Sequence, residues 1–220
     1  MTHTRKKRDL ADIKRYFDLL FERFGPQSWW PAKSRFEVIV GAILTQNTNW
    51  ANVEKAISRL KEARCLTPSA IHNVEAGALA EHIRPAGYFN IKAGRLKHFT
   101  AHLFEHHGGS LDKMLRQRDG LRDELLSING IGPETADSIM LYAGGHPEFV
   151  VDAYTRRIFS RHGFIDANAS YGETKAIFTS ALPGETGLFN EYHALIVRTA
   201  KEHCVKKAPR CGKCPLAGFL

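Results

Sequence analysis

Residues 125–137 have the sequence Leu-Leu-Ser-Ile-Asn-Gly-Ile-Gly-Pro-Glu-Thr-Ala-Asp, in which Gly130 and Gly132 flank Ile131 between two helical patterns. Glycine tolerates positive φ angles and allows another backbone to approach closely. The helix predicted to begin at Pro133 presents N–H groups that have no partner within the helix. A hairpin formed by these two glycines and the isoleucine can bind a phosphate group, directly or through a cation, without charged side chains. A tight turn between two helices is the alternative explanation.

Hydrophobic residues recur at helical spacing through most of the chain. Residues 36–44 are hydrophobic on every side, as expected of a helix buried inside a bundle. Only Phe149-Val150-Val151 has an extended pattern. We therefore predict an all-α fold. Its expected helices lie at about residues 10–24, 36–44, 50–60, 91–104, 121–127, 133–142, 155–162, 175–182 and 191–203, with a further helix starting at Thr67-Pro68.

Basic side chains outnumber acidic ones, 31 Lys and Arg against 23 Asp and Glu, which gives a formal net charge of +8. Both ends of the sequence are basic: residues 1–23 hold seven basic and four acidic side chains, and residues 201–220 hold five basic and one acidic. A basic surface favours a polyanionic partner, although a solvated surface with a disordered N-terminal arm would have the same composition. The longest hydrophobic run, residues 38–44, is far shorter than the roughly 20 residues of a membrane span. We expect a soluble, intracellular, cytoplasmic protein with no membrane partner.

Residues 150–157, Val-Val-Asp-Ala-Tyr-Thr-Arg-Arg, follow the hairpin closely in sequence. Asp152 would stand at a helix N-terminus, where it can cap the helix and where the helix dipole favours its ionised form. Together with residues 125–137, this segment resembles the helix-hairpin-helix and Val-Asp segments of the endonuclease III superfamily of DNA glycosylases. The resemblance implies that Asp152 is catalytic and stabilises the positive charge that develops on the sugar as the base departs. A purely capping role is the alternative, and the two roles are compatible.

The same resemblance implies a partner and an active site. The partner is double-stranded DNA that contains damaged bases. We expect the protein to be a monomer that associates with the nucleoid of a prokaryote. We expect two helical lobes: a barrel at residues 35–147 that ends in the helix-hairpin-helix, and a second lobe made of residues 1–34 plus 148–220. The active site would lie in the cleft between them.

Glu134 stands two residues after the second hairpin glycine. Superfamily members that also cut the DNA backbone carry at this position a lysine, whose amine forms a Schiff base with the sugar. A carboxylate cannot form an imine, so we expect a monofunctional glycosylase that leaves an abasic site. Glu134 excludes Schiff-base formation at this position. Its own role is most simply explained as that of an acidic residue that complements the helix dipole.

Three further segments, residues 28–31, 36–48 and 84–93, resemble the 3-methyladenine DNA glycosylase III branch. In that branch the tryptophan pair, here Trp29 and Trp30, belongs to the base pocket, and the turn at Gln46 and Asn47 inserts into the duplex. The alternatives are hydrophobic packing for the tryptophans and a plain helix end for the turn.

The expected pocket suits alkylated purines. Purines alkylated at N3 or N7 carry a positive charge, which weakens the glycosidic bond and is attracted to an electron-rich indole. We therefore expect release of 3-methyladenine and related bases. The alternatives are an endonuclease III-like glycosylase for oxidised pyrimidines or mismatches, and a non-catalytic module that only binds lesion-containing DNA.

Cys204, Cys211 and Cys214 match the spacing of the first three ligands of the endonuclease III 4Fe–4S loop. The fourth cysteine would fall at Leu220, and Cys65 lies in a distant helical segment. Two hypotheses follow. The three thiolates hold a 4Fe–4S cluster through an incomplete ligand set, or the thiols are free and the basic residues of the loop face phosphate groups.

Overall fold

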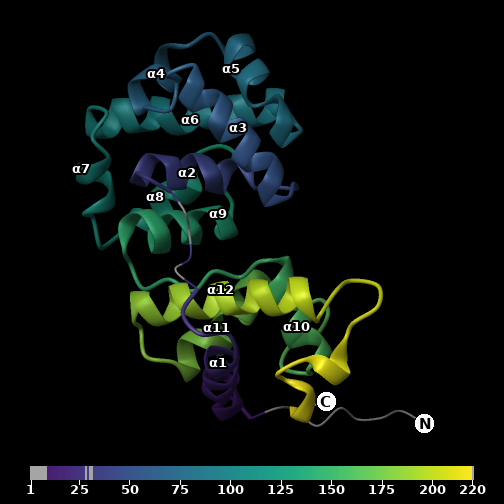
Figure 1. Ribbon diagram of the computed structural model, residues 1–220. Helices are drawn as coiled ribbons and strands as arrows, with labels where there is room; N and C mark the ends of the chain where they lie inside the picture. The colour runs from purple at the N-terminus through teal and green to yellow at the C-terminus, as the bar shows by residue number, and fades with distance from the viewer. Residues whose placement is uncertain (1–8, 28, 30–31, 220) are drawn as a thin grey trace. The chain divides into compact units, whose positions relative to one another are not determined.

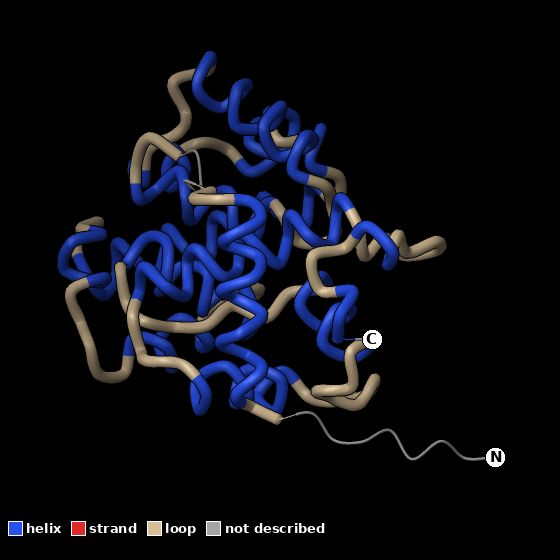
Figure 2. The backbone as a smooth tube through the Cα atoms, turned by 60° about the horizontal axis from the view of Figure 1, so that its bottom comes forward, coloured by secondary structure: helices blue, strands red, loops and turns tan. Residues whose placement is uncertain are grey.

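The computed structural model describes residues 9–27, 29 and 32–219, and all regular secondary structure within them is helical (Figures 1 and 2). The all-α prediction is therefore confirmed. None of the described helices is long and hydrophobic enough to cross a lipid bilayer. The twelve α-helices of this part of the chain are α1 Ala11–Phe24, α2 Arg35–Leu44, α3 Trp50–Glu62, α4 Pro68–Asn73, α5 Ala76–His82, α6 Phe89–His107, α7 Leu111–Leu115, α8 Leu121–Ser127, α9 Pro133–Ser138, α10 Ala153–Arg161, α11 Tyr171–Ala181 and α12 Thr186–Glu202.

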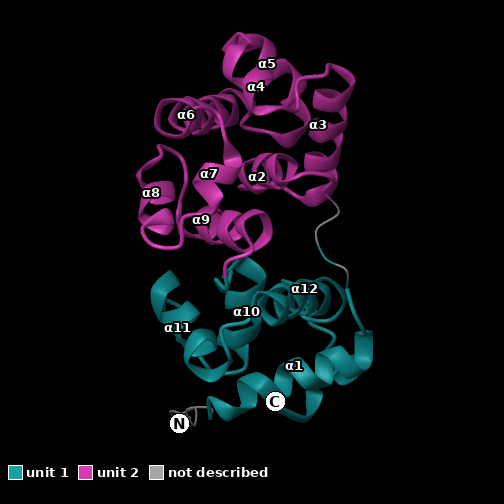
Figure 3. Cartoon of the chain, turned by 90° about the vertical axis from the view of Figure 1, so that its left-hand side faces the viewer, with its two compact units in different colours: residues 1–29, 147–220 teal, residues 30–146 magenta. Residues whose placement is uncertain are grey.

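The chain divides into two compact units, distinguished by colour in Figure 3. One unit is continuous and comprises residues 30–146, which include α2 to α9. The other is discontinuous, because residues 1–29 with α1 join residues 147–220 with α10 to α12.

In the continuous unit, α2 is the central helix. All of its residues from Phe36 to Leu44 are buried, including Glu37, whose carboxylate lies 2.6 Å from Lys61 Nζ. The helix packs against α3, α6, α9 and a π-helical segment at Ile139–Gly144. Burial on every side explains why the sequence of α2 has no polar face.

In the discontinuous unit, α12 is the most buried helix, and α1 and α10 pack against it. Aromatic residues from separate segments form its core: the rings of Phe149 and Phe178 stack with centroids 3.9 Å apart. The hydroxyl of Tyr192 donates to the carbonyl of Ile13 at 2.8 Å, which fixes α1 on α12. This unit therefore needs both ends of the chain to complete its core.

Several helix boundaries differ from the sequence expectations. Helix α11 begins at Tyr171 rather than near residue 175, because Ser170 and Glu173 form a capping box. Helix α12 begins at Thr186 rather than near residue 191, and the helix expected at 133–142 is interrupted at Ser138, where the π-helical segment follows. Helices α5 and α7 are short elements that the hydrophobic pattern did not indicate.

Candidate active site

The hairpin lies between α8 and α9, as the sequence predicts. Gly130 has a φ of +93°, and a Cβ there would lie 2.3 Å from Cγ of Arg95, so this position requires glycine for two reasons. Gly132 is the N-cap of α9 and has an ordinary φ of −96°, and a Cβ there would meet nothing within 4 Å. The space beside Gly132, at the N-terminus of α9, is therefore open. Glu134 is exposed in that first turn.

Gln46 is hydrogen-bonded to the hairpin. Its Nε2 donates to the carbonyl of Gly130 at 3.1 Å and lies 2.9 Å from Oγ1 of Thr135, while its Oε1 accepts from Arg95. Asn47 is exposed and has a left-handed φ of +55°. Of the two predicted wedge residues, Gln46 thus shares a hydrogen-bonded network with the predicted phosphate-binding hairpin.

Lys92 supports the start of this turn from inside the core. The side chain is 1% exposed, and its Nζ donates to the carbonyls of Leu44 at 2.9 Å and Ala86 at 2.7 Å. Burial, with a smaller contribution from Arg95, lowers the pKa of Lys92 to about 8. Sequence reasoning missed this residue, although Lys92 lies in segment 84–93, which the sequence analysis had already singled out.

Asp152 caps α10 with one carboxylate oxygen. Its Oδ1 accepts from the backbone N–H of Thr155 at 2.7 Å and from the Thr155 hydroxyl at 2.9 Å, whereas its Oδ2 lies 3.5 Å from Nε2 of His193. Burial alone would raise the pKa of Asp152, but the interactions with His193 and Thr155 outweigh it and lower the pKa below its ordinary value. The carboxylate is therefore ionised at neutral pH.

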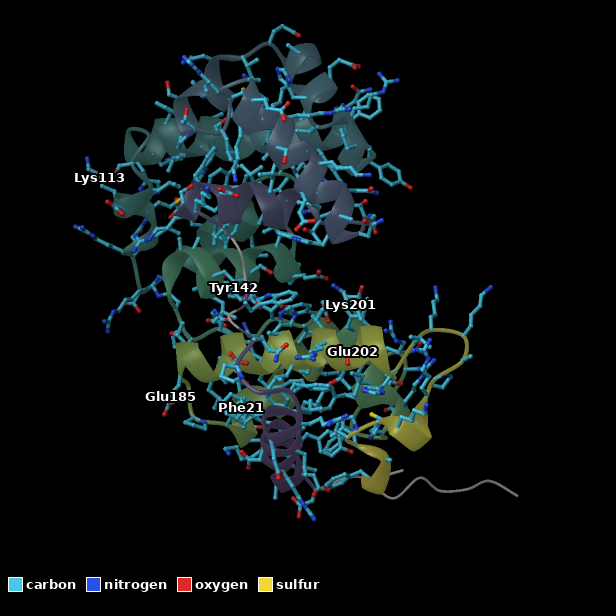
Figure 4. All side chains as sticks on the ribbon, viewed as in Figure 1. Phe21, Lys113, Tyr142, Glu185, Lys201 and Glu202 are labelled. Atoms are coloured by element: carbon cyan, nitrogen blue, oxygen red, sulfur yellow. The ribbon has the colours of Figure 1, made fainter. Side chains whose placement is uncertain are left out.

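His193 connects Asp152 to Trp29. It is buried on α12, and its ring meets the indole edge to face, with centroids 6.5 Å apart. The indole Nε1 of Trp29 is buried and has no hydrogen-bond partner in the described part of the chain. On the same helix, Lys201 Nζ lies 6.0 Å from the centroid of the Trp29 ring, and Figure 4 labels Lys201 near the end of α12. Trp30, the second predicted pocket residue, lies outside the described residues.

Sequence reasoning did not identify His193. The available signal was a titratable residue within the hydrophobic run Tyr192–Val197, where a buried polar side chain needs a partner. Its partner Asp152 is 41 residues away in sequence, so only the fold relates the two.

The cysteine loop packs on α10. Cys204 is buried, and Arg161 Nη1 lies 3.2 Å from its sulfur, while Arg157 donates to its carbonyl at 2.7 Å. Burial raises the pKa of the Cys214 thiol, a hydrogen bond with the backbone of Leu216 lowers it, and Cys204 and Cys211 raise it further. Within the described residues, the three sulfurs do not form a group within 4.8 Å of one another, the separation suited to a single ion. Only their spacing in sequence matches three ligands of a larger cluster, and the expected fourth position is a leucine.

The comparisons with known proteins agree with one another. Residues 40–183 match the profile of the HhH-GPD superfamily base excision DNA repair protein. A protein of Methanocaldococcus jannaschii, assigned as a DNA repair glycosylase, is 49% identical over 216 residues, which cover 97% of this chain and 98% of that protein.

Solved structures of DNA glycosylases are also similar to this chain. A trapped covalent intermediate of endonuclease III with DNA has a TM-score of 0.84 and 25% identity, over 96% of this chain and 95% of that one. The H. pylori 3-methyladenine DNA glycosylase bound to 1,N6-ethenoadenine has a TM-score of 0.74 and 28% identity, over 90% of this chain and 100% of that one.

The chain therefore belongs to the HhH-GPD superfamily of base excision DNA repair proteins. It is a DNA-binding base-excision-repair glycosylase, and the predicted resemblance to the endonuclease III superfamily is confirmed.

Proposed function

We propose that this enzyme is a monofunctional DNA glycosylase that releases alkylated purines, such as 3-methyladenine, from double-stranded DNA. The observation that supports the proposal most is the arrangement of Asp152, His193 and Trp29. One imidazole lies beside an ionised carboxylate and faces an indole whose buried N–H has no described partner.

Asp152 is proposed as the catalytic residue. As the bond between the base and C1′ breaks, positive charge develops on the sugar, and a nearby carboxylate lowers the energy of that state. The capping hydrogen bonds occupy Oδ1 and leave Oδ2 on the side of His193. Water then bonds to C1′, and its proton is lost to solvent or to the carboxylate.

His193 is proposed as a positioning residue that acts through Asp152. Its Nε2 lies 3.5 Å from Asp152 Oδ2, so the imidazole limits the rotation of the carboxylate without needing to touch the DNA. A His193→Gln variant should lower the rate of base release and raise the pH of the acid limb of its pH–rate profile, because the interactions that lower the pKa of Asp152 are weakened.

Trp29 is proposed as a wall of the base pocket, with Trp30 as its partner. The face of an indole attracts a cationic base more strongly than a neutral one, and the unpartnered Nε1–H offers a donor. A purine that carries a positive charge leaves as a neutral base, so the site needs no strong acid to protonate it. Alkylated purines carry the positive charge that an indole attracts, and they leave as neutral bases. The 3-methyladenine glycosylase of H. pylori has the same fold.

The DNA contacts are proposed at the hairpin and at the adjoining turn. Gly130, Ile131 and Gly132 would bind a backbone phosphate through the first turn of α9, while Gln46 and Asn47 would fill the space left by the extruded nucleotide. The hydrogen bonds from Gln46 to the hairpin support this pairing of roles.

The three cysteines are proposed as ligands of a 4Fe–4S cluster that lacks a fourth cysteine. When bound, such a cluster would cross-link the loop and supply no step of base excision. Arg157 and Arg161 already tie this loop to α10 through hydrogen bonds to its backbone, so we expect the loop to keep its place without a cluster. We further propose that the enzyme acts as a cytoplasmic monomer, with residues 35–147 and residues 1–34 plus 148–220 as its two domains.

The second candidate is an endonuclease III-like enzyme that removes oxidised pyrimidines and cuts the backbone. One observation favours it: the amine of Lys201 lies beside Trp29, so a nucleophile is present although Glu134 occupies the usual lysine position. Borohydride reduction during turnover distinguishes the two. Our proposal predicts no covalent protein–DNA adduct on a denaturing gel, whereas an adduct that disappears in Lys201→Gln would establish the second candidate.

A further inference from the structure

Two histidines and a glutamate converge in the continuous unit, outside the candidate active site. His102 and His107 lie in the last turns of α6, and Glu124 lies in α8. The Nε2 atoms of His102 and His107 are 2.7 Å and 2.5 Å from the same carboxylate oxygen, Oε1 of Glu124. All three ligand atoms lie within 4.8 Å of one another, and the three side chains are only 12–19% exposed.

The glutamate is oriented by a fourth side chain. Gln117 Nε2 donates to Glu124 Oε2 at 3.1 Å, which leaves Oε1 directed at the two imidazoles. A ligand held by a second hydrogen bond in this way is typical of metal centres.

We propose that His102, His107 and Glu124 bind a zinc ion. Two imidazole nitrogens and one carboxylate oxygen form a set that zinc accepts, with water as the fourth ligand. Zinc bonds of about 2.0–2.2 Å in a tetrahedral site separate the ligand atoms by about 3.3 Å. The present separations from Glu124 need to lengthen by less than about 1 Å, a change that a small rotation of these side chains can provide.

The zinc ion joins α6 to the helix that leads into the hairpin. Other residues of α6 already contact the hairpin: His98 Nδ1 lies 3.2 Å from the carbonyl of Asn129, and the Arg95 side chain packs against Gly130. The ion therefore adds a cross-link in the middle of α8, and its role is structural. This inference does not depend on which lesion the enzyme removes.

Zinc stoichiometry and affinity of the full-length chain test the proposal. His102→Gln and His107→Gln each remove a ligand, and Glu124→Gln keeps both imidazoles and the side-chain shape. His106→Gln is the matched control, because the His106 and His102 ring centroids are 4.3 Å apart but His106 Nε2 lies nearest Glu105, at 4.0 Å. Because cysteine thiolates in general can bind zinc, each variant is compared with wild type at the same content of free thiols. Cobalt(II) spectra separate nitrogen and oxygen ligation from thiolate ligation.

We expect wild type and His106→Gln to bind one zinc equivalent more than the three ligand variants, or to bind it at least tenfold more tightly. Zinc should also raise the unfolding temperature of wild type more than that of Glu124→Gln. Equal stoichiometry and affinity in wild type and Glu124→Gln would overturn the proposal. Equal loss of zinc in His106→Gln would overturn it as well, because it would show diffuse binding by surface histidines.

Discussion

At the residue scale, Asp152 uses its two carboxylate oxygens for different purposes. Oδ1 holds the N-terminus of α10 through Thr155, and Oδ2 faces His193. The capping explanation and the catalytic explanation of this residue therefore do not compete. A substitution that preserves the cap and removes only the charge separates the two roles.

Asp152→Asn is that substitution, because asparagine caps helices about as well as aspartate. We expect base release to be abolished in single-turnover assays, while the unfolding temperature and the affinity for lesion-containing duplex stay close to wild type. Asp152→Ala should in addition lose about 1 kcal/mol of stability with the cap. Normal turnover in Asp152→Asn would mean that the residue is only a cap.

Trp29→Leu tests selection of a cationic base by the indole. Leucine keeps a hydrophobic side chain but removes the π-face, whose attraction for a buried cation is worth about 2 kcal/mol, or roughly thirtyfold in rate. Excision of 7-methylguanine should fall by about this factor and excision of neutral hypoxanthine by much less. Equal losses on both bases in single-turnover assays would assign Trp29 to packing alone.

At the scale of the elements, the two hairpin glycines are required for different reasons. Gly130 has a positive φ and faces Arg95, whereas Gly132 has an ordinary φ and open space beside it. Gly130→Ala should therefore cost about 1–3 kcal/mol of stability through backbone strain. Gly132→Ala should leave the unfolding temperature nearly unchanged but weaken duplex binding, because its methyl group occupies the proposed phosphate position.

Thermal unfolding and duplex titrations of both variants check this pair. The opposite pattern, a stable Gly130→Ala and an unfolded Gly132→Ala, would contradict the assignment of roles within the hairpin.

Lys92 gives the continuous unit a dependence of stability on pH. Its pKa falls from 10.5 in the unfolded chain to about 8 in the folded protein, so the unfolded chain binds more protons between these values. Below pH 8 the folded protein holds Lys92 charged, and burial of this charge lowers the free energy of unfolding by its full amount. This destabilisation is lost as the pH rises from 8 toward 10.5. The free energy of unfolding of wild type should therefore rise relative to Lys92→Met by roughly 2 kcal/mol between pH 7 and pH 10.

Urea unfolding of the two proteins at both pH values measures that difference. A difference that stays constant with pH would show that Lys92 titrates normally despite its burial.

At the scale of the whole molecule, the sequence predicted what depends on local patterns. The continuous hydrophobic run of α2 and the Gly-Ile-Gly turn are local signals, and both correspond to the observed elements. The capping box at Ser170 was an equally local signal that the hydrophobic pattern alone did not reveal. Helices α5 and α7 are too short for a hydrophobic period to stand out.

The side-chain pairs of the candidate site could not be predicted in the same way. His193 reaches Asp152 across 41 residues of sequence, and Lys92 reaches the carbonyl of Leu44 across 48. Such contacts depend on how helices pack, which no local pattern specifies. The residues Asp152 and Gln46 could be proposed from motifs, but the partners that orient them required the fold.

Base release from single-lesion duplexes tests directly whether this enzyme is a monofunctional glycosylase for alkylated purines. Purified protein is incubated with duplexes that carry 3-methyladenine, 7-methylguanine or thymine glycol, and the products are scored with and without alkaline cleavage of abasic sites. We predict release of the two alkylated purines, with strand breaks that appear only after alkali, and no release of thymine glycol. Release of thymine glycol with strand cleavage in the absence of alkali would contradict the account, and release from none of the duplexes would contradict it equally.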